Sequence, residues 1–226
     1  MRFYRNDRKN LREIEELYID GREHFLDFFK RPTGLASSFG YSLTSLDFDG
    51  DGLDDLVVSA PQFFDKGSDG NDAGGAVFVF LSSQNTDEKP FGKATVLVGS
   101  SGSHFGQSLT NGNDANLDGF EELIIGAPSS GQVFIFNGGK TVSKTASQVL
   151  NGKDFEIESF GLAVSGGQDF DKNGHPDLLV GGKDAIVAIP TRPVISISSL
   201  ISLTDIDGEE IQSISVEGKK MIMIYF

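Results

Sequence analysis

A nine-position acidic pattern occurs three times in this chain and constrains the fold more than any other feature. It has the form Asp-x-(Asp/Asn)-x-(Asp/Asn)-Gly-x-x-(Asp/Glu) and begins at Asp47, Asp114 and Asp169. Each copy follows a Phe-Gly pair and precedes a short apolar run, such as residues 56–60. Self-similarity of this kind is the signature of a repeated supersecondary unit. The fold is therefore expected to consist of at least three such units.

The spacing of the copies indicates what the unit is. Their first residues are 67 and 55 positions apart, too long for a helical hairpin and suitable for a four-stranded β-propeller blade with a variable outer loop. Further strands are predicted at residues 76–81, 94–98 and 132–136. The first of these is apolar on both faces, as in a strand buried on both sides. The sequence thus predicts an all-β fold with three blades over residues 34–190.

The acidic pattern also matches the requirements of a calcium site. Calcium takes six to eight oxygen ligands, and side chains at positions 1, 3 and 5 converge if the chain curls at the Gly of position 6, which tolerates positive φ. The carbonyl of position 7 then turns inward, and the acid at position 9 completes the ligand set. The predicted ligands are Asp47, Asp49, Asp51, Leu53 and Asp55 in the first loop, Asp114, Asn116, Asp118, Phe120 and Glu122 in the second, and Asp169, Asp171, Asn173, His175 and Asp177 in the third.

Two other interpretations of these loops explain less. An EF-hand loop shares the opening positions but needs a bidentate Glu at position 12 and flanking helices. Position 12 is here Val58, Ile125 or Val180, each inside an apolar run that predicts a strand. A plain Asp-Gly hairpin turn explains the glycine but not four oxygen-bearing side chains in register. The first loop, with four carboxylates, is expected to bind calcium most tightly, and the longer Glu122 predicts weaker binding by the second.

Charge and motif content exclude several functions. The net charge of −14 argues against a nucleic-acid partner, which requires a basic surface. The chain has no cysteine, so neither disulfides nor thiolate metal sites can form. No leader and no apolar run long enough for a membrane span are apparent. The three histidines are isolated, and no catalytic or phosphate-binding motif occurs; we expect no enzyme activity.

The combination of Phe-Gly, acidic loop and Gly-Ala-Pro resembles the FG-GAP repeats of integrin α subunits, whose propellers have seven blades. Residues 63–70 and 75–79 are similar to part of the integrin fifth blade. Residues 169–195 are similar to the seventh blade where it leads into the thigh domain. The resemblance covers about residues 34–200. It implies a partial seven-bladed β-propeller of three FG-GAP blades, followed at 191–226 by the first strands of an Ig-like thigh domain.

The resemblance also implies a function. An integrin α subunit is a cell-surface receptor for cell adhesion and signalling that binds calcium and pairs with an integrin β subunit. Its extracellular-matrix or cell-surface ligands are contacted mostly by blades that precede the three present here. Tyr41 fits the family's aromatic position, just after Phe-Gly, that contacts the β subunit, whereas Gln107 and Leu162 at the matching positions do not. The alternatives are the propeller of a secreted phospholipase-like enzyme and a free-standing soluble FG-GAP scaffold.

The ends of the chain depart from the family pattern. Residues 1–33 are expected to be a remnant of a preceding blade or a poorly ordered segment, in which Leu11, Ile14, Leu17 and Tyr18 form a helical stripe. Residues 195–203 and 221–226 are predicted strands of the thigh domain. Three blades cannot close a ring, and an Ig sandwich needs about a hundred residues. The chain is therefore interpreted as a fragment or a truncated product.

Overall fold

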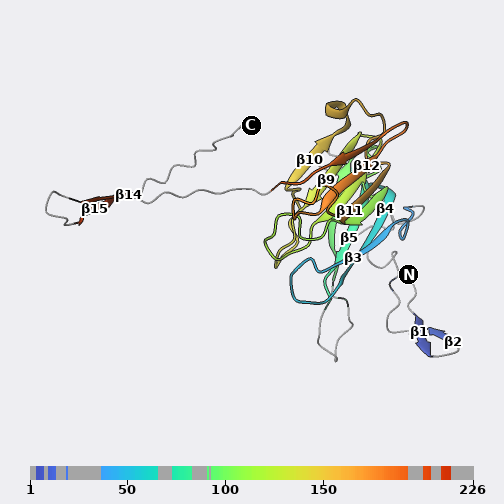
Figure 1. The fold of residues 1–226 in the computed structure, drawn as a ribbon. Coiled ribbons are helices and arrows are strands. Elements are labelled where there is room, and N and C mark those ends of the chain that lie inside the picture. Colours follow the sequence, from blue (N-terminus) through green and yellow to red (C-terminus); the bar gives the residue numbers. More distant parts are fainter. Residues whose placement is uncertain are drawn as a thin grey trace. The chain divides into compact units, whose positions relative to one another are not determined.

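The chain forms two compact units, Met1–Pro193 and Val194–Phe226. The computed structural model describes residues 4–7, 10–13, 19, 37–65, 73–82, 91, 93–192, 201–204 and 210–214. Among them every regular element is a β-strand except a short 3-10 helix, η2 (Gly152–Phe155) (Figure 1). No helix in these segments has the length and apolarity needed to cross a bilayer. The prediction of an all-β fold is confirmed.

Each acidic repeat has an antiparallel sheet of its own, in which every strand pairs with the next strand along the chain. The first sheet contains β3 (Leu43–Leu46), β4 (Asp55–Asp65), β5 (Ala73–Phe80) and β6 (Thr95–Ser100). The second contains β7 (Ser108–Asn111), β8 (Leu123–Ala127), β9 (Gln132–Phe136) and β10 (Gln148–Asn151). The third contains β11 (Ala163–Gln168), β12 (Asp177–Gly181) and β13 (Ile186–Ile189). The strands predicted at 76–81, 94–98 and 132–136 correspond to β5, β6 and β9.

The core lies between successive sheets. Alternate residues of a strand point to opposite faces, and in β8 this alternation separates two apolar clusters. Leu123 and Ile125 pack with Val57 of the first sheet, whereas Ile124 packs with Leu178 and Val180 of the third. The second sheet is therefore covered on both faces, and the three sheets are stacked in chain order. This packing explains the uninterrupted apolar runs after each acidic loop.

The Phe-Gly pairs mark the closest approach between sheets. Phe105 and Phe160 are 2% and 0% exposed and fill the core between neighbouring sheets. Gly161 has a φ of +88°, and a Cβ added at Gly126 would lie 2.1 Å from the Gly161 carbonyl oxygen. Both positions therefore require glycine, one for its backbone conformation and the other for space.

Two further strand pairs each form a separate two-stranded sheet. β1 (Tyr4–Asp7) pairs with β2 (Asn10–Glu13), and in the second unit β14 (Ile201–Thr204) pairs with β15 (Glu210–Ile214). Leu11, the first residue of the expected helical stripe, lies in β2, so a strand replaces the helix there; Ile14, Leu17 and Tyr18 lie outside the described residues. The strand predicted at 195–203 is described only from Ile201 onward, and 221–226 lies outside the described residues. The thigh domain stays a prediction.

Candidate metal centres

Each acidic loop joins the first strand of its sheet to the second. The loops connect β3 to β4, β7 to β8 and β11 to β12. Their position-12 residues, Val58, Ile125 and Val180, lie inside β4, β8 and β12, and each is 0% exposed. They cannot serve as calcium ligands, so the rejection of the EF-hand interpretation is confirmed.

The three loops curl in the same way. In the first, the Asp47 carboxylate accepts hydrogen bonds from the backbone N–H groups of Asp51 (3.0 Å) and Gly52 (2.9 Å), and Asp49 accepts one from Asp51 (3.1 Å). The equivalent bonds occur in the second and third loops. The glycines at position 6 have φ values of +87°, +91° and +89°. The predicted curl at glycine is thus present three times.

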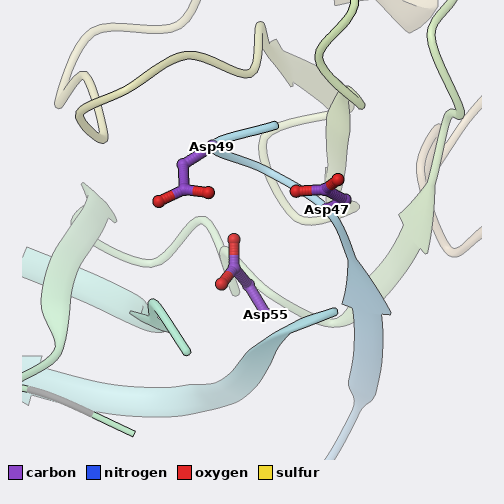
Figure 2. A group of neighbouring side chains, drawn as sticks. All are labelled: Asp47, Asp49 and Asp55. Carbon is purple, nitrogen blue, oxygen red and sulfur yellow. The ribbon is translucent and has the colours of Figure 1, made fainter. Parts of the chain in front are cut away.

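Two loops bring three carboxylates together. Oxygen atoms of Asp47, Asp49 and Asp55 lie within 4.8 Å of one another, and Figure 2 shows these side chains directed toward a shared space. The third loop forms the same group from its acids at positions 1, 3 and 9, namely Asp169, Asp171 and Asp177. Calcium–oxygen distances of about 2.3–2.6 Å place two ligands of one ion up to about 5 Å apart. The donor type and the spacing therefore both fit calcium.

The position-5 side chains accept hydrogen bonds from the backbone N–H groups of the position-7 residues in the first and third loops. Asp51 is not part of the convergent group; its carboxylate accepts a hydrogen bond from Leu53 N–H at 2.8 Å. Asn173 makes the same bond with His175, also at 2.8 Å. These side chains hold the end of the loop, and a ligand role for them and for the position-7 carbonyls, including that of Phe120, stays a prediction.

The position-9 aspartates of the first and third loops each accept hydrogen bonds at both carboxylate oxygens. Asp55 accepts hydrogen bonds from Phe48 N–H (3.0 Å) and Ser82 N–H (2.8 Å). Asp177 accepts the equivalent bonds from Phe170 N–H (2.7 Å) and Thr191 N–H (2.9 Å). These bonds hold each carboxylate in place at the first residue of β4 or β12. Sequence reasoning missed Ser82 and Thr191, because they follow the third strand and lie outside the acidic pattern.

The electrostatics of these two acids differ. Burial raises the pKa of Asp55, and the charge of Asp49 adds to the effect, while hydrogen bonds from Ser82 and Phe48 oppose it. At Asp177 burial also opposes ionisation, but N–H donors, the strongest from Thr191, outweigh it and lower the pKa. Repulsion among the carboxylates of the first loop is a cost that a divalent cation would relieve.

The second loop differs at Glu122. One carboxylate oxygen, Oε2, accepts a hydrogen bond from Ala115 N–H at 2.6 Å, whereas Oε1 is buried and has no hydrogen-bond partner. Burial raises the pKa of Glu122 to about 7, and the charges of Asp118 and Asp114 contribute. Within the described segments these three acids do not form a convergent group like those of the other loops. An orphaned buried oxygen beside two acids nevertheless fits a cation ligand.

Comparison with known proteins identifies the relatives. The FG-GAP repeat model matches residues 39–80 and 105–141. Integrin alpha-6 of Gallus gallus is 38% identical over 174 residues, integrin alpha-7 of Rattus norvegicus 42% over 173, and integrin alpha ina-1 of Caenorhabditis elegans 37% over 195. The chain carries FG-GAP repeats and is homologous to integrin α subunits. These alignments cover 74–76% of the chain and 15–17% of each relative.

The FG-GAP matches include the first and second acidic loops but not the third. The third loop, residues 169–177, is equivalent by its hydrogen bonds and its convergent carboxylates. The integrin-like resemblance inferred from the repeats is therefore confirmed, and the geometry extends the repeat to the third sheet.

Proposed function

We propose that this integrin-like chain is the calcium-binding β-propeller part of an integrin α subunit, a cell-surface receptor for adhesion and signalling. The observation that carries the proposal is the same convergent set of carboxylates at the same strand–loop–strand position in two of the stacked sheets. A bound calcium ion would offset the repulsion among these carboxylates and join the first strand of a sheet to the second. The function supported is binding and structural stabilisation rather than catalysis.

The exposed face of the third sheet supports its interpretation as a propeller blade. Val77 and Val133 occupy equivalent positions in the first two sheets and are both 0% exposed, but their counterpart Ile186 is 78% exposed. Phe48 is likewise 0% exposed, whereas its counterpart Phe170 is 53% exposed. The third sheet thus presents side chains suited to a further sheet of the same kind. We place the three sheets last in a seven-bladed ring, followed by an Ig-like thigh domain.

The proposed partner is an integrin β subunit. Tyr41, the aromatic residue after the first Phe-Gly pair, is 55% exposed, and its hydroxyl accepts a hydrogen bond from the Gln107 side-chain amide at 2.6 Å. The side chain is therefore oriented and accessible to another chain. Extracellular-matrix or cell-surface ligands would be bound by blades that precede these three in the parent protein.

Calcium binding is tested by calorimetric titration of the chelator-treated 226-residue chain. Asp47→Asn combined with Asp49→Asn is expected to abolish one binding event, whereas Asp54→Asn, at an exposed acid outside the convergent group, is expected to retain it. No heat of binding and an unchanged thermal midpoint in the wild type would refute the calcium proposal. Failure of a full-length parent to co-precipitate with an integrin β subunit would refute the receptor assignment and favour a free-standing scaffold.

A further inference from the structure

The first acidic loop is held by the second sheet as well as by its own. Glu121, just before β8, accepts hydrogen bonds at Oε2 from the backbone N–H of Asp47 (2.7 Å) and from the Asn111 side-chain amide (2.8 Å). Its own N–H donates to the Asp47 carbonyl oxygen at 3.3 Å. Asp47 is the position-1 residue whose carboxylate belongs to the convergent group. A side chain of the second repeat thus fixes the backbone of a predicted ligand in the first.

Two neighbouring residues extend this contact. The ring of Phe120 lies against Gly50, where an added Cβ would be 2.9 Å from the ring. Lys140 donates from Nζ to the carbonyl oxygen of Asp49 (2.7 Å) and more weakly to that of Gly50 (3.4 Å), and lies 5.5 Å from the Phe120 ring centroid. The backbone around ligand position 3 is therefore also held by the second sheet.

The contact is particular to this junction. Asp54 and Pro176 occupy the position of Glu121 in the first and third repeats. Proline has no side-chain acceptor, so the third loop cannot hold the second in the same way; instead His175 Nδ1 lies 3.0 Å from the Ala115 carbonyl oxygen. The Glu121 bond is thus not a general property of the repeat.

We propose that Glu121 is a positioning residue for the first calcium loop and that, with Phe120 and Lys140, it makes the calcium affinity of that loop depend on the second sheet. The proposal rests on the proposed calcium binding. Groups that orient a metal ligand through hydrogen bonds contribute to affinity without touching the metal.

The test is a calcium titration of the 226-residue chain followed by NMR at single residues. The amides of Gly52 and Gly174 report separately on the first and third loops, since each donates to the position-1 carboxylate of its own loop. Glu121→Ala is expected to weaken binding reported by Gly52 by about 10- to 100-fold and to leave Gly174 unchanged. Glu121→Gln retains an acceptor oxygen and should stay close to wild type. Asp54→Ala, which removes the same charge beside the same loop, should cause no comparable loss.

Each alternative result is informative. The positioning role would be overturned if the calcium affinity reported by Gly52 were equal in wild type and Glu121→Ala. It would also be overturned if the Glu121→Ala, Glu121→Gln and Asp54→Ala variants lost calcium affinity equally; in both cases the proposed calcium binding would stand. Parallel weakening at Gly174 would indicate a general structural effect and would also overturn it. Lys140→Met is a second variant. A positioning role predicts weaker calcium binding reported by Gly52, whereas the loss of a positive charge alone predicts tighter calcium binding. No calcium response at any loop of the wild type would refute the proposed function itself.

Discussion

Glu122 is predicted to make the folded state less stable as the pH rises. Glu122 is 3% exposed, and one of its carboxylate oxygens is buried without a hydrogen-bond partner. Burial raises its pKa from 4.5 to about 7, so the folded chain holds this proton more tightly than the unfolded chain. The stabilisation of the folded state that results from this pKa difference is fully present below about pH 4.5 and is lost as the pH rises through about 7.

The size of the effect follows from the pKa difference. One pKa unit corresponds to about 1.4 kcal/mol, so the rise from 4.5 to about 7 predicts a loss of about 3 kcal/mol in the free energy of unfolding between acid and weakly alkaline pH. Replacing Glu122 by Gln removes the ionisation and should remove this component. Other titrating groups, including Asp55, act in both proteins, so the difference between wild type and variant isolates Glu122.

The assay is denaturant unfolding in the presence of chelator from about pH 5 to about pH 8. The free energy of unfolding of wild type should decline more steeply with pH than that of Glu122→Gln. Glu158→Gln is a matched control, because that side chain is 79% exposed and pairs with Lys183 at the surface. Parallel pH profiles for wild type and Glu122→Gln would show that the buried carboxylate does not carry the predicted cost.

Three further predictions concern the loops and the sheet stack. Calcium at a hundred times its Kd should stabilise the wild type by about 2.7 kcal/mol per independent site, measured as a rise in thermal midpoint that chelator reverses. Gly126→Ala should destabilise by about 1–3 kcal/mol because the new methyl group meets Gly161 backbone, whereas Gly139→Ala, with its nearest neighbour at 4.0 Å, should stay within about 0.5 kcal/mol; equal denaturation midpoints would contradict this. Ile186→Lys should reduce self-association in sedimentation experiments, because Ile186 is 78% exposed on the third sheet and exposed apolar surface promotes association. A wild type that is monomeric at all concentrations would contradict this prediction.

The repeated parts of the structure were predictable from sequence for a physical reason. A strand covered on both faces must be apolar at consecutive positions, and β5 shows this with Val77 and Phe78 both 0% exposed. The turn at the glycine of each acidic loop is closed by hydrogen bonds within five residues; in the first loop the Asp47 carboxylate accepts them from the N–H groups of Asp51 and Gly52. Local hydrogen bonds and burial pattern therefore suffice for the strands and loops of each repeat.

The contacts between repeats were not predictable in the same way. Glu121 and Asp47 are far apart in sequence, and their bond depends on how one sheet is placed on the next. Position 8 of the acidic pattern accepts any residue, as Asp54 and Pro176 show, so composition gives no indication that Glu121 has a role. The expected weakness of the second loop was inferred from side-chain length alone, whereas the structure adds a cause in the unpaired oxygen of Glu122.

The contacts between repeats also affect how the calcium affinities of the three loops should be ranked. The sequence pattern alone ranks the loops by their number of carboxylates. The number of carboxylates favours the first loop, which has four acids, yet the convergent groups of the first and third loops contain the same three positions, 1, 3 and 9. What then distinguishes them is preorganisation: Glu121 and Lys140 hold the first loop from a neighbouring sheet, and a ligand set already held in place loses less entropy on binding. The first loop should therefore remain the tightest site, and Glu121→Ala should bring its affinity down toward that of the third.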